Sequence, residues 1–175
     1  PPPVCDDDED CAGDLVCTAG VCAEAAPAPA VPAVGQVVVS ELLYDPHNGL
    51  DDNDAEWVEI YNNTDTALSL EGCYLFDEGR AENPMDGGAD LSGLVLASGA
   101  YAVFARSDER ALNGGLQVNG TFPFALGNGG DTVGVWCNGV VIDAVTYDDG
   151  ERFPDARAVS LNRDAEQLNG ANTPD

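Results

Sequence analysis

The sequence predicts an all-β domain, a sandwich or a barrel, that follows a small disulfide-rich module. From Gln36 onwards, short runs of β-branched and aromatic residues are separated by turn residues such as glycine and asparagine, which indicates many short strands. Four of the six cysteines lie within the first 22 residues, where the chain is too short to form a hydrophobic core. Strands and long helices do not alternate, and this excludes a parallel-sheet nucleotide-binding fold.

Residues 1–23 are expected to form the disulfide-rich module. An even number of cysteines in a short segment favours disulfides and an oxidising compartment. Zinc is the alternative, but thiolate zinc sites favour C-x2-4-C pairs, and the spacing here is C-x5-C-x5-C-x4-C. Among the possible pairings we favour the interleaved one, Cys5 with Cys17 and Cys11 with Cys22.

Residues 24–34 are rich in alanine and proline and predict a semi-rigid, extended spacer. The main domain is then expected over residues 35–163, with a C-terminal tail over residues 164–175. The chain opens with prolines and no stretch resembles a signal peptide, so we expect a processed form or a fragment of a longer protein.

Strands are expected where apolar and polar residues alternate between turn signals. In Glu56–Asn62, for example, Val58 and Ile60 share one face. The helix signal is confined to Ser107–Leu112, where the serine is a suitable N-cap. The remaining predicted strands are Gln36–Tyr44, Cys73–Phe76 after Leu68–Leu70, Leu91–Leu96, Tyr101–Ala105, Phe122–Leu126 and Ala158–Leu161.

The segment Asp131–Tyr147 predicts a β-hairpin. Asn138-Gly139 supplies the two positive-φ residues of a type I′ turn. With this turn, the register places on one core-facing side the pairs Cys137–Val140, Val135–Ile142 and Val133–Ala144. The other side would then carry Trp136, Val141, Asp143 and Val145. The apolar stripe on that side is either covered by the same chain or is an interaction surface, and it consists of Trp136, Val141 and Val145.

The charge of the chain restricts its partners. Six arginines, no lysine and 32 acidic residues give a net charge of −26. Nucleic acid and anionic membrane surfaces would be repelled, and no apolar run is long enough to span a membrane. Either salt or divalent cations are expected to reduce the self-repulsion of so acidic a chain.

The loop Asp45–Glu56 is the best candidate for a metal site. Calcium takes about six to eight oxygen ligands from carboxylates, amides and carbonyls, and this glycine-containing loop is rich in such groups. The spacing is not that of an EF-hand, and a solvated acidic loop is the alternative. The expected calcium ligands are Asp45, Asp51, Asp52, Asn53, Asp54 and Glu56.

Catalysis is not expected. His47 is the only histidine and lies among acidic residues, and no nucleophile elbow, phosphate-binding or zinc-protease motif occurs. A hydrolase that uses paired carboxylates is the residual possibility, but no pair stands out.

Several segments of the predicted domain form a recognisable set: VVVSELLYDP (37–46), AEWVEIYNNTD (55–65), LSLEGCYLFD (68–77), LASGAYAVFAR (96–106), the turn Asn128–Asp131 with VGVWCNGVVIDAVTY (133–147), and AVSLNR (158–163). Taken together, these segments resemble the lamin-tail domain, an immunoglobulin-like sandwich also found in secreted bacterial proteins. The chain departs from the lamin-tail pattern at its end, ANTPD, where the family continues into a stretch with tryptophan and Gly-Thr-Pro-Gly. The first 23 residues likewise resemble short four-cysteine repeats of secreted bacterial proteins.

The resemblance implies an immunoglobulin-like fold and no catalytic residues. The residues themselves favour a disulfide between Cys73 and Cys137. Cys137 is on the core-facing side of the hairpin and Cys73 shares a strand face with Leu75, so both would point inward, as the inter-sheet disulfide of immunoglobulin-like domains does. Two separate buried thiols are the alternative.

We therefore expect a secreted, non-enzymatic structural or adhesive protein, a building block of a cell-surface or extracellular assembly or fibre that calcium stabilises. Its partners would be further copies or other surface proteins. The alternatives are an accessory binding or targeting module of a larger secreted hydrolase and a carbohydrate-binding module that uses Trp57 or Trp136.

Overall fold

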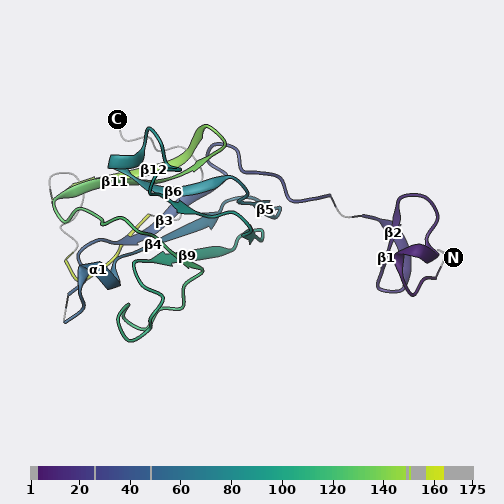
Figure 1. Cartoon of the computed structure of the whole chain (residues 1–175), viewed down its shortest axis with the longest axis horizontal. Coiled ribbons are helices and arrows are strands. Elements are labelled where there is room, and N and C mark those ends of the chain that lie inside the picture. Colours follow the sequence, from purple (N-terminus) through teal and green to yellow (C-terminus); the bar gives the residue numbers. More distant parts are fainter. Residues whose placement is uncertain (1–3, 26, 48, 149, 151–156, 164–175) are drawn as a thin grey trace.

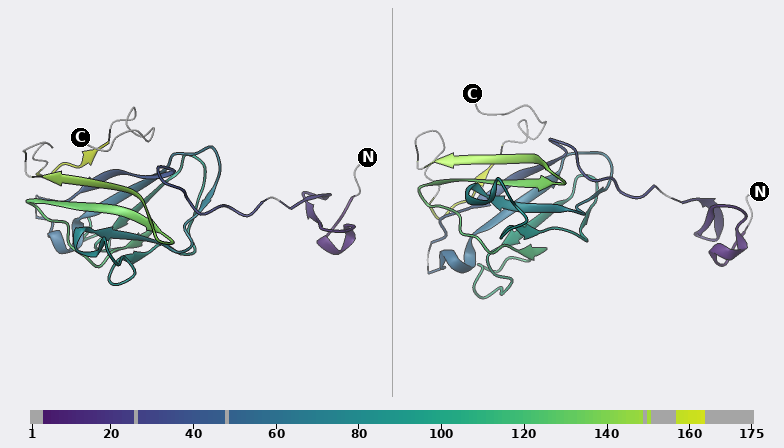
Figure 2. Two further views of the ribbon diagram at one scale, coloured as in Figure 1. Left: turned by 90° about the horizontal axis from the view of Figure 1, so that it is seen from above. Right: turned by 45° about the horizontal axis from the view of Figure 1, so that its top comes forward.

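The computed structural model describes residues 4–25, 27–47, 49–148, 150 and 157–163, and it confirms the all-β fold class. Two sheets pack face to face as a sandwich, and the N-terminal module lies apart from it at the end of an extended linker (Figure 1). The two further views show the same two layers and the same separation (Figure 2).

The larger sheet has five strands in the order β10-β9-β4-β3-β13, and the smaller has four in the order β12-β11-β6-β7. All neighbours are antiparallel except β10 and β9, which are parallel. The strands are β3 (Val37–Leu43), β4 (Trp57–Asn62), β6 (Cys73–Asp77), β7 (Ala89–Asp90), β9 (Tyr101–Ala105), β10 (Gly120–Thr121), β11 (Gly130–Cys137), β12 (Val140–Asp148) and β13 (Leu161–Asn162).

Short elements fill the connections. A two-stranded sheet pairs β5 (Leu68–Ser69) with β8 (Val95–Leu96). The helical segments of the main domain are α1 (Asp52–Ala55) and the 3-10 turn η2 (Glu78–Arg80). The N-terminal module holds the 3-10 turn η1 (Asp8–Asp10) and the hairpin β1 (Leu15–Thr18) and β2 (Val21–Glu24).

The core lies between the two sheets and follows from the alternation of each strand. Val58 and Ile60 of β4 belong to the same buried cluster as Val133 and Val135 of β11. Each alternates with residues that point away from this core, as a strand with one buried face requires. Burying this shared face is the main favourable term in folding such a domain.

The Cys73–Cys137 disulfide forms, but it does not join the two sheets. Cys73 on β6 lies directly opposite Cys137 on β11, so the bond links neighbouring strands of the four-stranded sheet. The inter-sheet geometry expected from immunoglobulin domains is therefore wrong. The sequence correctly predicted that both cysteines face the core. A core-facing cysteine can bond to a cysteine on the facing sheet or on the adjacent strand, and the sequence pattern did not distinguish the two.

The hairpin has the predicted turn but not the full predicted register. Asn138 and Gly139 have φ of 47° and 95°, as the type I′ turn requires. Cys137 pairs with Val140, but a β-bulge follows beyond Trp136. Val135 consequently pairs with Asp143 and Val133 with Val145, each one residue away from the predicted partner.

Asp143 gives the bulge its physical reason. Its carboxylate accepts a hydrogen bond from the backbone N–H of Val39 on β3 at 2.8 Å. The same carboxylate forms an ion pair with Arg163 at 3.0 Å. The side chain thereby gives this amide a partner beyond the end of β13, which pairs with β3 only at Glu41 and Leu42. A regular hairpin would have pointed Asp143 away from β3.

Four other sequence-based boundaries are also wrong. The predicted strand Ala158–Leu161 contains only the first residue of β13, and the residues before it form a turn and a bend. Phe122–Leu126 is not a strand, although Phe122, Phe124 and Leu126 are buried in the core. Of Leu91–Leu96 only β8 is a strand, and Ser107–Leu112 forms turns rather than a helix. The α-helix of the described residues is instead α1, inside the loop predicted to bind calcium.

Asn62, at the end of β4, ties two loops together. It is fully buried, and its side-chain amide donates to the carbonyl oxygens of Thr66, Leu96 and Ala97 at 2.8–2.9 Å. Its side-chain oxygen accepts from the backbone N–H and the hydroxyl of Thr64. The carbonyls of Thr66 and Ala97 also accept from the Thr64 hydroxyl and the Ala100 N–H, so the buried carbonyl of Leu96 depends most on this amide.

We expect Asn62→Ala to lower the free energy of unfolding by about 2 kcal/mol, because the buried Leu96 carbonyl loses this donor and the Thr64 N–H loses its acceptor. Urea unfolding followed by tryptophan fluorescence measures this loss. The control is Asn83→Ala, at an exposed position, which should change the midpoint little. Equal midpoints for Asn62→Ala and the parent chain would contradict the role given to this amide.

The N-terminal module contains the disulfides Cys5–Cys17 and Cys11–Cys22, the pairing favoured from the sequence. The linker is shorter than residues 24–34, because Ala30 already forms a parallel bridge with Leu68 of β5. The predicted tail, residues 164–175, lies outside the described residues.

Candidate functional site

The predicted calcium loop lies at the end of the sandwich opposite the linker, where α1 is seen in Figure 1. Asp51 is the N-cap of α1 and accepts the backbone N–H of Asn53 at 2.9 Å, which lowers the pKa of its carboxyl. Asp45 pairs with Arg157 at 3.5 Å, and Asp52 accepts from the amide of Asn128 at 3.0 Å.

The structure does not bring the six predicted ligands together. Asp51 and Asn53 are exposed, whereas Glu56 is turned into the protein interior. Within the described part of the chain, no three carboxylates approach one another closely enough to share an ion. The sulfurs of Cys5, Cys11 and Cys22 do lie that close together, but all three are in disulfides. Calcium binding stays a prediction.

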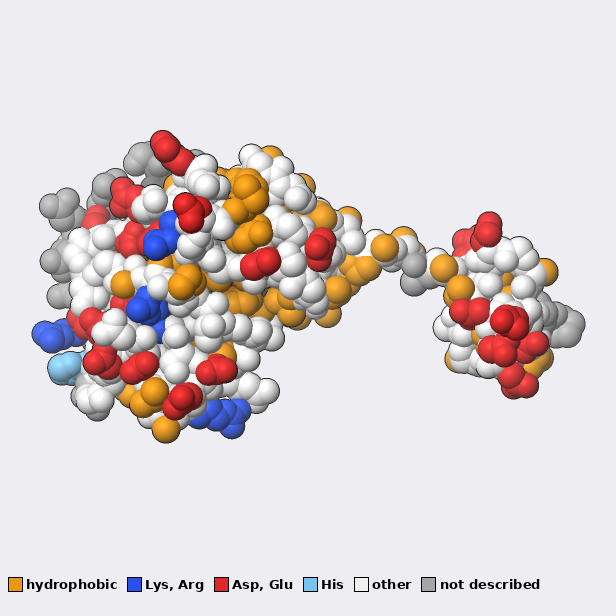
Figure 3. All heavy atoms as spheres, in the orientation of Figure 1, with side chains coloured by type: hydrophobic (Ala, Val, Ile, Leu, Met, Phe, Trp, Pro, Cys, Tyr) orange, Lys and Arg blue, Asp and Glu red, His pale blue; other side chains and the backbone are white. Residues whose placement is uncertain are grey.

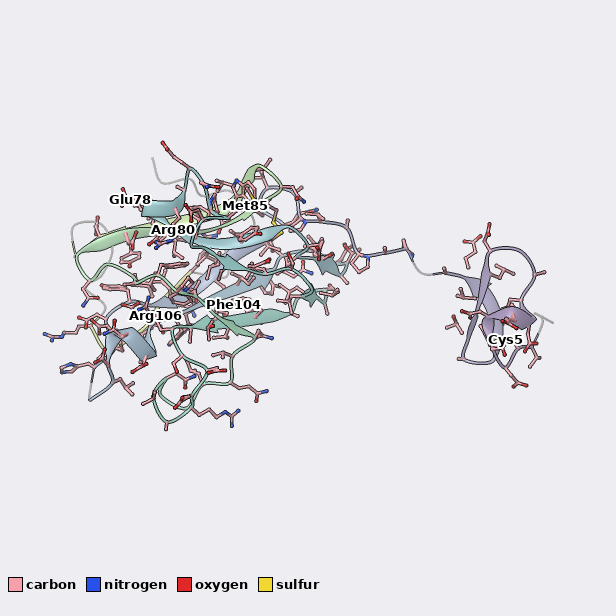
Figure 4. All side chains as sticks on the ribbon, in the orientation of Figure 1. Cys5, Glu78, Arg80, Met85, Phe104 and Arg106 are labelled. Carbon is pink, nitrogen blue, oxygen red and sulfur yellow. A yellow bond between two sulfur atoms is a disulfide. The ribbon has the colours of Figure 1, made fainter. Side chains whose placement is uncertain are left out.

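Glu56 is the most unusual ionisable group of this end. Only 1% of its surface is exposed, and its carboxylate accepts a hydrogen bond from the backbone N–H of Leu126 at 2.9 Å. The pKa of Glu56 is raised to about 7, mainly by burial and to a smaller extent by Asp52 and Asp131, against the opposing effects of that hydrogen bond and of Arg106. Arg106 stands 4.0 Å away and lies beside α1 in Figure 4.

Tyr147 lies in the same interior region and was not predicted from the sequence. Its ring stacks on Tyr44 at 4.5 Å between centroids. Its hydroxyl oxygen is the single buried side-chain polar atom of the described residues without a hydrogen-bond partner. Burial, with Asp131 and Glu56 nearby, raises the pKa of this hydroxyl, which therefore stays protonated. The alternation of β12 after the bulge was the signal that pointed Tyr147 inward.

Asp131 and Asp77 complete this interior end. Asp131 is held by the backbone N–H groups of Glu78, Gly127 and Thr132. Asp77 forms an ion pair with Arg80 at 2.6 Å, and Arg80 lies on the side of the four-stranded sheet in Figure 4. The arrangement can take up a proton on Glu56 near neutral pH. His47 is exposed and contributes no base to it.

The predicted interaction stripe is only partly a surface. Trp136 is half-buried and packs edge-on against Tyr74, with ring centroids 6.0 Å apart. Val145 is partly buried against the core, contrary to the prediction, because the bulge reverses its side. Val141 is 42% exposed.

Val141 instead belongs to a different apolar surface. The backbone N–H of Gly35 donates to the carbonyl of Ile142 at 2.9 Å, which brings the end of the linker beside the hairpin. Apolar side chains gather along the linker and around its attachment to the sandwich, whereas acidic side chains gather on the N-terminal module (Figure 3). We call the exposed residues at this attachment the hairpin–linker patch: Val31, Val34, Val140 and Val141.

A family model described as Lamin Tail Domain matches residues 30–149, more than half of the chain. The chain belongs to the lamin tail domain family. The match begins at Ala30, where the structure first joins the linker to the sandwich. It contains the whole hairpin, Glu56 and Tyr147, and leaves out the N-terminal module. No curated protein and no solved structure matches the chain.

As an immunoglobulin-like lamin tail domain, the sandwich is a structural or binding module of a generally non-catalytic kind. Its disulfides are typical of an oxidising environment. None of the helices in the described ranges is long and apolar enough to cross a membrane.

Proposed function

We propose that this protein is a secreted structural or adhesive module, a building block of a cell-surface or extracellular assembly. The hairpin–linker patch is the observation that carries the proposal. Its valines are 40–68% exposed in a chain whose net charge is −26. Exposed apolar residues that gather in one place mark contact surfaces rather than solvated faces.

The position of the patch suits assembly. Every charged residue between Val4 and Glu24 is acidic, so the N-terminal module repels other copies of itself. The linker separates that charge from the uncharged patch (Figure 3). Copies would therefore meet through the sandwich, and calcium would help by neutralising the exposed carboxylates.

We expect the purified chain to self-associate through the patch, and Val141→Asp to abolish this, because a carboxylate would be buried in the contact. Sedimentation velocity and negative-stain microscopy, each with and without millimolar calcium, measure the assembly. Calcium should shift the distribution toward larger species.

The matched control is Val159→Asp, at a residue that is 59% exposed and adjoins Ala158, which bonds Asp45 at the opposite end of the sandwich. It adds the same charge away from the patch. A chain that stays monomeric with and without calcium would rule out self-assembly, and equal effects of both variants would show that charge rather than the patch controls it.

A further inference from the structure

A cleft of about 240 Å³ opens on the face of the five-stranded sheet that points away from the core. It crosses four strands or their ends, from β9 over β4 and β3 to β13. It shares no residue with the hairpin–linker patch. Its lining residues are Ser40, Glu41, Glu59, Tyr101, Asn162 and Arg163.

Two carboxylates lie side by side in the lining of this cleft. Glu41 and Glu59 are direct cross-strand partners on β3 and β4, an arrangement of like charges that destabilises a sheet. The hydroxyl of Ser40 donates to Oε1 of Glu59 at 2.8 Å, and the hydroxyl of Ser160 donates to Oε1 of Glu41. Each carboxylate is thus oriented through one oxygen, and its other oxygen has no donor among the described residues.

The arginine of the cleft does not neutralise this pair. Arg163 directs its guanidinium to Asp143 at 3.0 Å, and its backbone N–H donates to the carbonyl of Ser40 at 2.8 Å. Burial, and after it the neighbouring Glu41, raises the pKa of Glu59. This is the behaviour of a carboxylate that lacks a cation.

An aromatic wall adjoins the two carboxylates. Tyr101 is 52% exposed, and its ring leans on Tyr61 of the neighbouring strand with centroids 4.6 Å apart. A supported tyrosine ring offers a π face to a cation. A guanidinium combines a flat face that stacks on such a ring with N–H groups that fit carboxylates.

We propose that this cleft binds an arginine side chain of a basic partner protein, with Tyr101 against its guanidinium and Glu41 and Glu59 accepting its hydrogen bonds. Charge complementarity favours a different protein over a second copy, because this chain carries −26 and no lysine. Four of its own arginines are already paired with carboxylates: Arg80, Arg106, Arg157 and Arg163. The proposal goes beyond self-assembly and does not depend on it.

The test is an NMR titration of the full chain with the peptide acetyl-Gly-Arg-Gly-amide at physiological salt, where attraction to the overall charge is screened. The same peptide with citrulline, which keeps the shape without the charge, is the ligand control. We expect amide resonances of β3, β4 and β9 around the cleft to shift with arginine and not with citrulline.

Glu59→Gln should weaken arginine binding about tenfold, since a charged hydrogen-bond acceptor is lost. Glu78→Gln removes the same charge at an exposed residue of η2, beside the other sheet, and should leave binding unchanged. Tyr101→Ala tests the aromatic wall independently and should weaken binding as well.

Equal binding of citrulline, equal losses in Glu59→Gln and Glu78→Gln, or no shifts at the cleft would each overturn the proposal. So would a neutral cellulose-derived oligosaccharide that moves the same resonances at lower concentration, because the cleft would then be a sugar site. If Glu59→Gln does not fold, unchanged affinity in Tyr101→Ala is the overturning result.

Discussion

Replacing Cys73 and Cys137 together with alanine should lower the free energy of unfolding of the sandwich by about 4 kcal/mol. The bond closes a loop with a sequence separation of 64, so its removal frees a long stretch of the unfolded chain. Both positions are buried, and the lost sulfur contacts add to the effect. Urea unfolding is the measurement, and both tryptophans of the chain, Trp57 and Trp136, report on the sandwich.

The control for this experiment is the removal of the Cys5–Cys17 bond by the same substitutions. That bond lies in the N-terminal module, separated from the sandwich by the linker (Figure 1). Its loss should leave the tryptophan-detected midpoint unchanged. Similar losses for the two double variants would show that the module and the sandwich unfold as one unit.

Glu56→Gln should raise the free energy of unfolding by about 3 kcal/mol at pH 8, because it removes a buried charge that the fold tolerates poorly. Glutamine keeps the size of the side chain and an oxygen that accepts from Leu126. The folded protein binds the Glu56 proton more tightly than the unfolded chain, since its pKa is about 7 instead of 4.5. Stability contributed by this group is therefore full below pH 4.5 and is lost as the pH rises through 7.

Thermal and urea unfolding from pH 5 to pH 8 measure this dependence. The free energy of unfolding of the parent chain should fall between pH 5 and pH 8. The fall should be smaller in Glu56→Gln. Glu82→Gln, at an exposed site, is the matched control and should retain the slope of the parent. A glutamine variant that is less stable than the parent at pH 8 would show that the ion pair with Arg106 outweighs the burial of the carboxylate.

The parts of the fold that local chemistry determines were predictable. Asn138-Gly139 specifies its turn because few dipeptides adopt two positive φ angles, and Glu56–Asn62 alternates cleanly enough to define β4. The bulge beyond Trp136 was not predictable, because it serves Asp143, whose partners Val39 and Arg163 lie far away in the sequence. A register read from the turn alone assumes regular pairing.

The candidate site shows the same limit. Composition correctly marked Asp45–Glu56 as the acidic loop, but it could not separate exposed Asp51, which caps a helix, from Glu56, which enters the core. That difference depends on where β4 begins. Tyr147 and the pair Glu41–Glu59 were missed because each becomes notable only through residues on neighbouring strands.

The buried amide of Asn62 has a consequence for how the chain can be produced. Asn62-Asn63-Thr64 is an N-glycosylation acceptor sequence, and the amide nitrogen that would carry the sugar is the atom that donates to Thr66, Leu96 and Ala97. A glycan at this position and a closed sandwich are mutually exclusive. In a host that modifies chains as they emerge, glycosylation would compete directly with folding.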